Sequence, residues 1–103
     1  MTIEEFQKLI EKLYYSKDKK RGIPKTFGWF CEEVGELARA LRYGERKNLE
    51  EEFADVFAWL VTLASLSNID LEKATRKYQK GCPKCKKLPC VCKEKKRLTT
   101  KNK

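Results

Sequence analysis

The chain has 103 residues, with 24 Lys and Arg against 15 Asp and Glu, five Cys and no His. This length suits one domain with a modest core and is too short for a two-domain enzyme. The absence of histidine excludes Ser-His and Cys-His nucleophiles and His-ligated metals, so catalysis would need carboxylates, thiols, Lys, Arg or a bound metal. No apolar run approaches the ~20 residues of a membrane span, and the acidic, amphipathic start is unlike a signal peptide. We therefore expect a cytoplasmic protein with no membrane partner.

Apolar residues that recur at three- and four-residue steps predict four helices, and no segment shows the alternation of a strand. The first helix spans residues 2–16, and the charged segment 17–24, with its Gly and Pro, is expected to be a loop. The second runs over residues 25–43, with Gly44 as its stop. The third opens at Asn48, an N-cap with Glu51 as box partner, and ends near residue 67. Asp70 caps a fourth helix that ends near residue 80, so residues 1–80 form an all-α domain.

The third helix predicts self-association. From Phe53 to Leu66, apolar residues cover most of its circumference. Such a helix must be covered on nearly every side, which three other helices in a small body can hardly do. A homo-oligomer, dimer or tetramer, that buries this helix at a subunit interface is the natural solution.

Pairs of acidic residues border the apolar stripes of the second and third helices. Glu33 and Glu36 share one flank of the second helix, and Glu52 and Asp55 share one flank of the third. If the helices pack antiparallel, the two pairs can converge. Without a cation they would repel one another, whereas a hard divalent cation, Mg²⁺ or Mn²⁺, would neutralise them. The alternative is a capping-box Glu together with ordinary solvated surface charge.

The motif Glu32-Glu33-x-x-Glu36, followed by Glu52-x-x-Asp55 on the next helix, resembles the signature of the MazG-type all-α nucleoside triphosphate pyrophosphohydrolases. The resemblance covers roughly residues 1–80 and implies a four-helix MazG-like bundle. It also implies hydrolysis of a nucleoside triphosphate between its α and β phosphates, giving a monophosphate and pyrophosphate. By position, Glu33, Glu36, Glu52 and Asp55 would be the Mg²⁺ ligands, while Glu32 would hold a water or a second metal, or be simply solvated.

Two other enzymes use similar carboxylate pairs. Phosphoribosyl-ATP pyrophosphatase and dUTP/dCTP pyrophosphatase are therefore the alternatives within the enzyme class.

Several basic and aromatic residues are candidates for binding a nucleotide. Arg21 could grip phosphate bidentately, and lysines would act as point charges. Trp29, beside the acidic flank, could stack on a base or simply belong to the core. Cys31 is expected to be a buried apolar filler. The candidate substrate-binding residues are Arg21, Lys25, Trp29, Lys73 and Lys77.

The last part of the chain carries a cysteine cluster, in the pattern C-x₂-C-x₄-C-x-C at Cys82, Cys85, Cys90 and Cys92. In a cytosolic chain this density predicts a metal site, and four thiolates suit structural, tetrahedral Zn²⁺. Two disulfides or an iron–sulfur cluster are the alternatives.

The same region is strongly basic. Residues 76–103 hold 12 Lys and Arg against one Glu, a net charge of +11, whereas residues 1–75 hold 12 Lys and Arg against 14 Asp and Glu, a net charge of −2. Residues 81–103 are therefore expected to form a zinc-knuckle-like tail that could touch nucleic acid through phosphates. The rival to the enzyme is a nucleic-acid-binding or regulatory module in which the helices only oligomerise and this tail carries the function.

Overall fold

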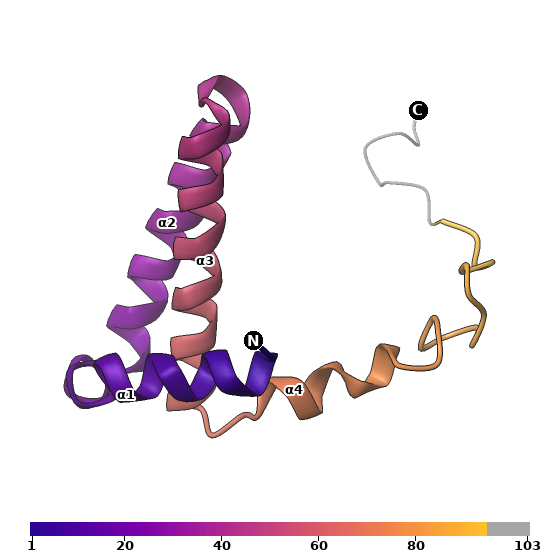
Figure 1. The fold of residues 1–103 in the computed structure, drawn as a ribbon, viewed down its shortest axis with the longest axis horizontal. Coiled ribbons are helices and arrows are strands. Elements are labelled where there is room, and N and C mark those ends of the chain that lie inside the picture. The colour runs from indigo at the N-terminus through magenta and orange to yellow at the C-terminus, as the bar shows by residue number, and fades with distance from the viewer. Residues whose placement is uncertain (95–103) are drawn as a thin grey trace.

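The computed structural model describes residues 1–94, and every regular element in that part of the chain is helical. The elements are α1 (Ile3–Arg21), α2 (Ile23–Tyr43), α3 (Arg46–Leu66), α4 (Leu71–Ala74) and the 3-10 helix η1 (Thr75–Tyr78). Helices α2 and α3 run antiparallel as a hairpin, α1 crosses the base of this hairpin, and α4 leads away from it toward the cysteine-rich segment (Figure 1). The predicted all-α fold class is confirmed.

Helix α1 is longer than its apolar pattern suggests. It begins with a capping box, in which the Thr2 hydroxyl accepts from the Glu5 N–H at 3.0 Å and the Glu5 carboxylate accepts from the Thr2 N–H at 2.8 Å. The predicted loop from residue 17 is wrong, because Lys and Arg are good helix formers and the helix continues to Arg21. It breaks only at Gly22, whose φ of 88° suits a residue without Cβ.

The other boundaries differ from the predictions in smaller ways. Helix α2 starts at Ile23, because Pro24 in its first turn needs no intrahelical N–H bond. Glu45 rather than Asn48 is the N-cap residue of α3, so the predicted cap is wrong, and Asn48 lies inside the helix. Asp70 does cap α4, since its carboxylate accepts from the Lys73 N–H at 3.1 Å. The α-helical part ends at Ala74, well before residue 80.

The register of the hairpin is symmetric about Gly44. Trp29 on α2 and Trp59 on α3 are equally far along the chain from Gly44, and their rings meet edge to face with centroids 5.5 Å apart. Residues on the facing sides of an antiparallel hairpin can meet in this way when they are equally far from the turn.

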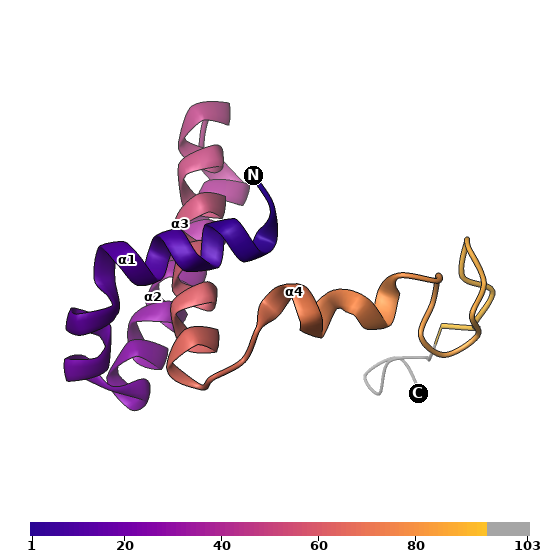
Figure 2. The ribbon, with the colours of Figure 1, turned by 60° about the horizontal axis from the view of Figure 1, so that its bottom comes forward.

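Helix α1 is fixed across the base of the hairpin by polar contacts. The buried Gln7 amide donates to the Ser65 hydroxyl at 3.1 Å and to the Ile69 carbonyl at 2.8 Å, and its oxygen accepts from the Leu71 N–H at 3.0 Å. These bonds tie α1 to the end of α3 and to the start of α4. The C-terminal turn of α1 lies beside the start of α2, because Gly22 alone connects the two helices (Figure 2).

The described chain has a small apolar core. Its buried apolar residues are Ile10, Ala40, Val61 and Ala64. Many large apolar side chains on α2 and α3 stay exposed, among them Phe53 at 53% and Leu41 at 60%. Within residues 1–94 no single helix is long and apolar enough to cross a membrane. By length and composition α3 and Leu71–Tyr78 would pass only when taken together, and they are bent by 98°.

Candidate active site and cysteine cluster

Three carboxylates from the two hairpin helices converge at one place. Glu33, Glu52 and Asp55 each offer an oxygen, and these oxygens lie within 4.8 Å of one another. Glu33 comes from α2, whereas Glu52 and Asp55 lie on one face of α3 at a spacing of three residues. Because Glu33 and Asp55 are equally far from Gly44, the hairpin register brings them together. We call this group the carboxylate cluster.

The other two predicted acidic residues lie around the cluster. Glu36 is outside the group of three, yet its charge is close enough to contribute to the raised pKa of both Glu33 and Glu52. Glu32 is exposed, and its charge is the smallest of the causes that raise the pKa of Glu33. Four of the five acidic residues therefore gather around one point, with Glu32 at its edge.

The cluster is electrostatically strained. Burial, followed by the charge of Asp55, raises the pKa of Glu33 and that of Glu52. Oε1 of Glu52 is buried without a hydrogen-bond partner. No ion pair within residues 1–94 neutralises these carboxylates, since the two ion pairs there join Lys8 to Glu4 and Arg21 to Asp18. A buried carboxylate oxygen without a partner is costly, and a bound cation would remove that cost.

An aromatic and cationic stack lies one helical turn from the cluster. The Arg21 guanidinium sits 4.9 Å from the ring centre of Trp29 and 5.0 Å from that of Trp59. Its nitrogens donate to Oδ1 of the buried Asp18 at 2.6 and 3.1 Å. Two of the predicted substrate-binding residues, Arg21 and Trp29, are thus brought together by α1 and the hairpin.

A cavity of about 340 Å³ adjoins the stack between α1 and α3. Asp55 and Trp59 line it from α3, and Lys17, Asp18 and Arg21 line it from α1. The remaining lining residues are Ile10, Tyr14, Ala58 and Thr62. The cavity therefore opens next to a member of the carboxylate cluster.

The remaining predicted substrate-binding residues lie outside this cavity. Lys25 is exposed in the first turn of α2, and Lys73 and Lys77 are exposed on α4 and η1. Cys31 is exposed rather than buried, so its prediction as a core residue is wrong. It lies on α2, whose outward surface α1 and α3 leave uncovered in the single chain.

Sequence reasoning misses Asp18 as part of the site. The spacing Asp18-x-x-Arg21 is the available signal, because residues three apart face one another on a helix. The spacing has this meaning only on a helix, and the sequence pattern predicts a loop for residues 17–24.

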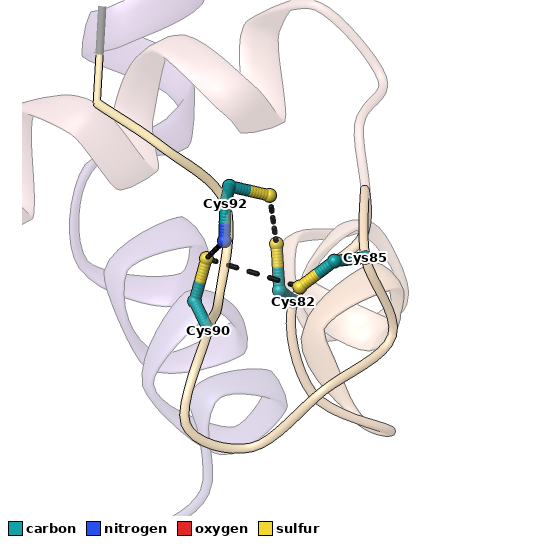
Figure 3. Close-up of side chains that lie close together, drawn as sticks. All are labelled: Cys82, Cys85, Cys90 and Cys92. Atoms are coloured by element: carbon teal, nitrogen blue, oxygen red, sulfur yellow. Dashed lines mark hydrogen bonds between the residues drawn. The ribbon is translucent and has the colours of Figure 1, made fainter.

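The four cysteines of the C-terminal segment also converge (Figure 3). The sulfurs of Cys82 and Cys92 lie 3.9 Å apart, as do those of Cys85 and Cys90, and all four lie within 4.8 Å of one another. No disulfide joins them, because each is a free cysteine. The edge of a tetrahedron with Zn–S bonds of ~2.3 Å is about 3.8 Å, so the sulfurs are spaced as such a metal requires.

The backbone shapes this cysteine cluster. Gly81 has φ 106°, and a Cβ there would meet the Lys87 carbonyl oxygen at 2.8 Å, so the turn requires glycine. The Val91 N–H donates to the Cys85 sulfur at 3.5 Å and, as the largest cause, lowers the pKa of Cys85 to about 6. Hydrogen bonds to neighbouring sulfurs, that of Cys90 first, raise the pKa of Cys92 to about 12. Thiolate charge thus concentrates on Cys85, where backbone donors stabilise it.

Comparison with known proteins identifies the family. The profile of the MazG nucleotide pyrophosphohydrolase domain matches residues 23–86, which include α2, α3 and the first two cysteines of the cluster. No individual curated protein matches the chain. The match covers more than half of the chain and contains every residue of the carboxylate cluster. The chain therefore belongs to the MazG nucleotide pyrophosphohydrolase family, and is a hydrolase that acts on acid anhydrides.

Proposed function

We propose that this enzyme hydrolyses nucleoside triphosphates between the α and β phosphates, releasing a nucleoside monophosphate and pyrophosphate. The observation that carries the proposal is the carboxylate cluster of Glu33, Glu52 and Asp55, with Glu36 beside it and one buried Glu52 oxygen without a partner. Family membership supports the general reaction, hydrolysis of a nucleotide at a pyrophosphate bond.

The donor set of the cluster fits a hard divalent cation, Mg²⁺ or Mn²⁺. Only carboxylate oxygens are offered, and the chain has no histidine, which disfavours zinc at this place. Glu33, Glu36, Glu52 and Asp55 would hold the cation, and Glu32 would hold a water or a second cation at the edge. When bound, the cation supplies charge neutralisation for the polyphosphate and activation of the attacking water.

The cavity beside Asp55 is our candidate for the nucleoside site. Its volume of about 340 Å³ falls in the range of roughly 300–1,000 Å³ that ligand pockets occupy. Trp59 supplies an aromatic wall and is in edge-to-face contact with Trp29, and Lys17 supplies a positive charge. The cavity lining does not include Lys25, Lys73 or Lys77, which are exposed. Their positive charges could therefore meet phosphate groups only outside the cavity, as outer contacts.

The test is a substrate panel with matched variants. The full-length protein is incubated with Mg²⁺ and canonical and modified nucleoside triphosphates, and monophosphate and pyrophosphate are quantified. Turnover should stop with EDTA and return with Mg²⁺. Asp55→Asn and Glu33→Gln should lower kcat/KM by at least about 100-fold while the circular dichroism stays helical.

The matched control is Glu50→Gln, which removes an exposed charge from the same helix and should keep full activity. Retained turnover in Asp55→Asn, or release of orthophosphate in place of pyrophosphate, would overturn the proposal. Preferential turnover of phosphoribosyl-ATP, or of dUTP and dCTP, would assign the enzyme to one of those two classes.

We further propose that the protein works as a homo-oligomer, a dimer or tetramer. Large apolar side chains on the hairpin, including Phe27, Val34, Leu41 and Phe53, are exposed in the single chain. A second hairpin packed against them would bury a contiguous apolar surface, which is the main driving force of such association.

The cysteine cluster is our candidate for a structural Zn²⁺ site held by Cys82, Cys85, Cys90 and Cys92. The sulfur separations of 3.9 Å support zinc over two disulfides, whose sulfurs would lie about 2.05 Å apart. Four thiolates leave no open coordination position, so the ion would hold the segment 81–94 in shape. We also propose a cytoplasmic location, because the thiols that a zinc site needs stay reduced in that compartment.

Nucleic-acid binding is the second candidate function, and the basic segment favours it. Lys84, Lys86, Lys87 and Lys93 are exposed around the cysteine cluster. Further basic residues occur in 95–103, which lie outside the described residues. Such a surface would bind phosphates without base specificity, as an addition to the enzyme or as its own function.

A further inference from the structure

The contacts of Arg21 indicate its role. We propose that Arg21 is a positioning residue that locks Trp29 and Trp59 into a fixed stack and so shapes the nucleoside cavity, instead of gripping phosphate. This inference rests on the proposed function, because it assigns a residue within the same site.

One guanidinium contacts both tryptophans. Its centre lies 4.9 Å from the Trp29 ring and 5.0 Å from the Trp59 ring, well inside the ~6 Å reach of a cation–π contact. The two rings meet at 80° with centroids 5.5 Å apart. One guanidinium thus contacts both members of an edge-to-face ring pair at nearly equal distances.

Three of the five N–H donors of Arg21 are already engaged, and all three belong to its two terminal nitrogens. Two of its nitrogens donate to one Asp18 oxygen at 2.6 and 3.1 Å, and one of them also lies 3.4 Å from the hydroxyl of the buried Thr26. The side chains of Arg21 and Asp18 are only 14% and 6% exposed. An arginine that grips phosphate presents its terminal nitrogens to the ligand, whereas both terminal nitrogens of Arg21 donate to Asp18, whose carboxylate neutralises the charge.

The stack connects directly to the carboxylate cluster. Trp29 precedes Glu33 by about one helical turn, and Trp59 comes about one turn after Asp55. Trp59, Asp55 and Arg21 line the same cavity. A shift of the Trp59 ring would therefore change the wall against which a nucleoside rests, without touching the groups that would meet the polyphosphate.

The experiment separates the nucleoside from the phosphates. Arg21→Met removes the cation, Arg21→Lys keeps the charge but loses the fork, and Asp18→Asn keeps Arg21 but weakens its anchor. Lys20→Gln, an exposed basic neighbour on α1, is the control for the change in charge. The measurements are KM and kcat for the preferred nucleoside triphosphate, the inhibition constant of inorganic triphosphate, and tryptophan emission.

If Arg21 positions the tryptophans, its loss should change KM and leave kcat and the inhibition constant of inorganic triphosphate nearly unchanged. In Arg21→Met and Asp18→Asn the KM should rise roughly fivefold to tenfold, with kcat nearly unchanged and inhibition by inorganic triphosphate unaltered. Tryptophan emission should shift, because both tryptophans of the chain lie in the stack. Arg21→Lys should fall between the wild type and Arg21→Met, and Lys20→Gln should match the wild type.

Two results would overturn the inference. If binding of inorganic triphosphate weakens by the same factor as KM, Arg21 is a phosphate ligand. If emission and KM both stay at wild-type values in Asp18→Asn and Arg21→Met, the stack does not shape the site. Should the wild type show no turnover, titration of tryptophan emission with a nucleoside triphosphate and with inorganic triphosphate gives the same comparison, so failure of the reaction and failure of this inference remain distinguishable.

Discussion

Trp29 and Trp59 occupy mirror positions in the α2–α3 hairpin, and their rings meet edge to face at a centroid separation of 5.5 Å. The same symmetry about Gly44 relates Glu33 to Asp55, whose carboxylates belong to one cluster. Both pairs are thus held by the packing of two long helices, which positions side chains more firmly than a loop would.

Replacing Glu52 by Gln should raise the thermal stability of the EDTA-treated protein and abolish turnover. Burial and the charge of Asp55 raise the pKa of Glu52 above 4.5, so the folded protein binds more protons than the unfolded one. The wild type therefore loses stability as the pH rises through this raised pKa. The advantage of Glu52→Gln in Tm should grow from acidic pH to pH 7.

Calorimetry across this pH range checks the expectation. Glu50→Gln, which lies outside the cluster, should show no such gain, and Mg²⁺ should favour the wild type at pH 7. Equal melting temperatures for wild type and Glu52→Gln at pH 7 in EDTA would mean that the carboxylates do not repel one another.

Replacing Cys85 by Ser should remove zinc from the protein. Elemental analysis of the wild type should find about one Zn per chain, as a closed four-thiolate site requires. Cys31→Ser is the matched control, because Cys31 is exposed on α2 and lies outside the cysteine cluster. Bound iron with a visible absorption band would indicate an iron–sulfur cluster instead of zinc. Only one free thiol in the unreduced protein, after unfolding in EDTA, would indicate two disulfides.

Replacing Phe53 by Ser should shift the protein toward a monomer. Phe53 is 53% exposed in the single chain, so the substitution removes little of the intrachain core but much of the proposed interface. Light scattering coupled to size-exclusion chromatography reports the mass. Leu88→Ser, at a residue 88% exposed in the C-terminal segment, should leave the oligomer intact; a wild type that is itself monomeric at micromolar concentration contradicts the proposal.

Single-stranded nucleic acid should bind the zinc-loaded chain weakly and without sequence preference, if the second candidate function holds. The logarithm of the binding constant falls linearly with the logarithm of the salt concentration. Each lysine–phosphate contact that is removed should make this negative slope shallower by about 0.7. Lys86→Gln with Lys87→Gln tests this, because both side chains are exposed beside the cysteines. Binding is measured by fluorescence anisotropy at several salt concentrations. If the two substitutions leave the slope unchanged, these lysines do not contact the nucleic acid.

The all-α fold class and the position of the acidic residues on their helices follow from periodicity. Apolar residues spaced by three and four positions identify helices, and acidic residues at Glu33 and Asp55 fall on the edges of those stripes. Antiparallel packing then follows from the short connection between Tyr43 and Arg46.

The site around Asp18 and Arg21 is harder to predict. A run of charged residues with Gly22 and Pro24 after it has the composition of a loop, yet α1 continues through it because only Gly22 breaks the helix. The contacts of Arg21 with two tryptophans depend on how α1 crosses the hairpin. That crossing involves tertiary contacts such as those of Gln7 and the stacked rings of Phe6 and Phe57, which local sequence patterns do not contain.

The symmetry of the hairpin about Gly44 also limits how this protein can evolve. A residue inserted within α3 between Arg46 and Glu52 would rotate the remainder of the helix by about 100° and advance it by about 1.5 Å. Glu33 would then face a different side chain, however well the new residue favoured a helix. Related chains should accordingly differ by substitution along this stretch while conserving its length.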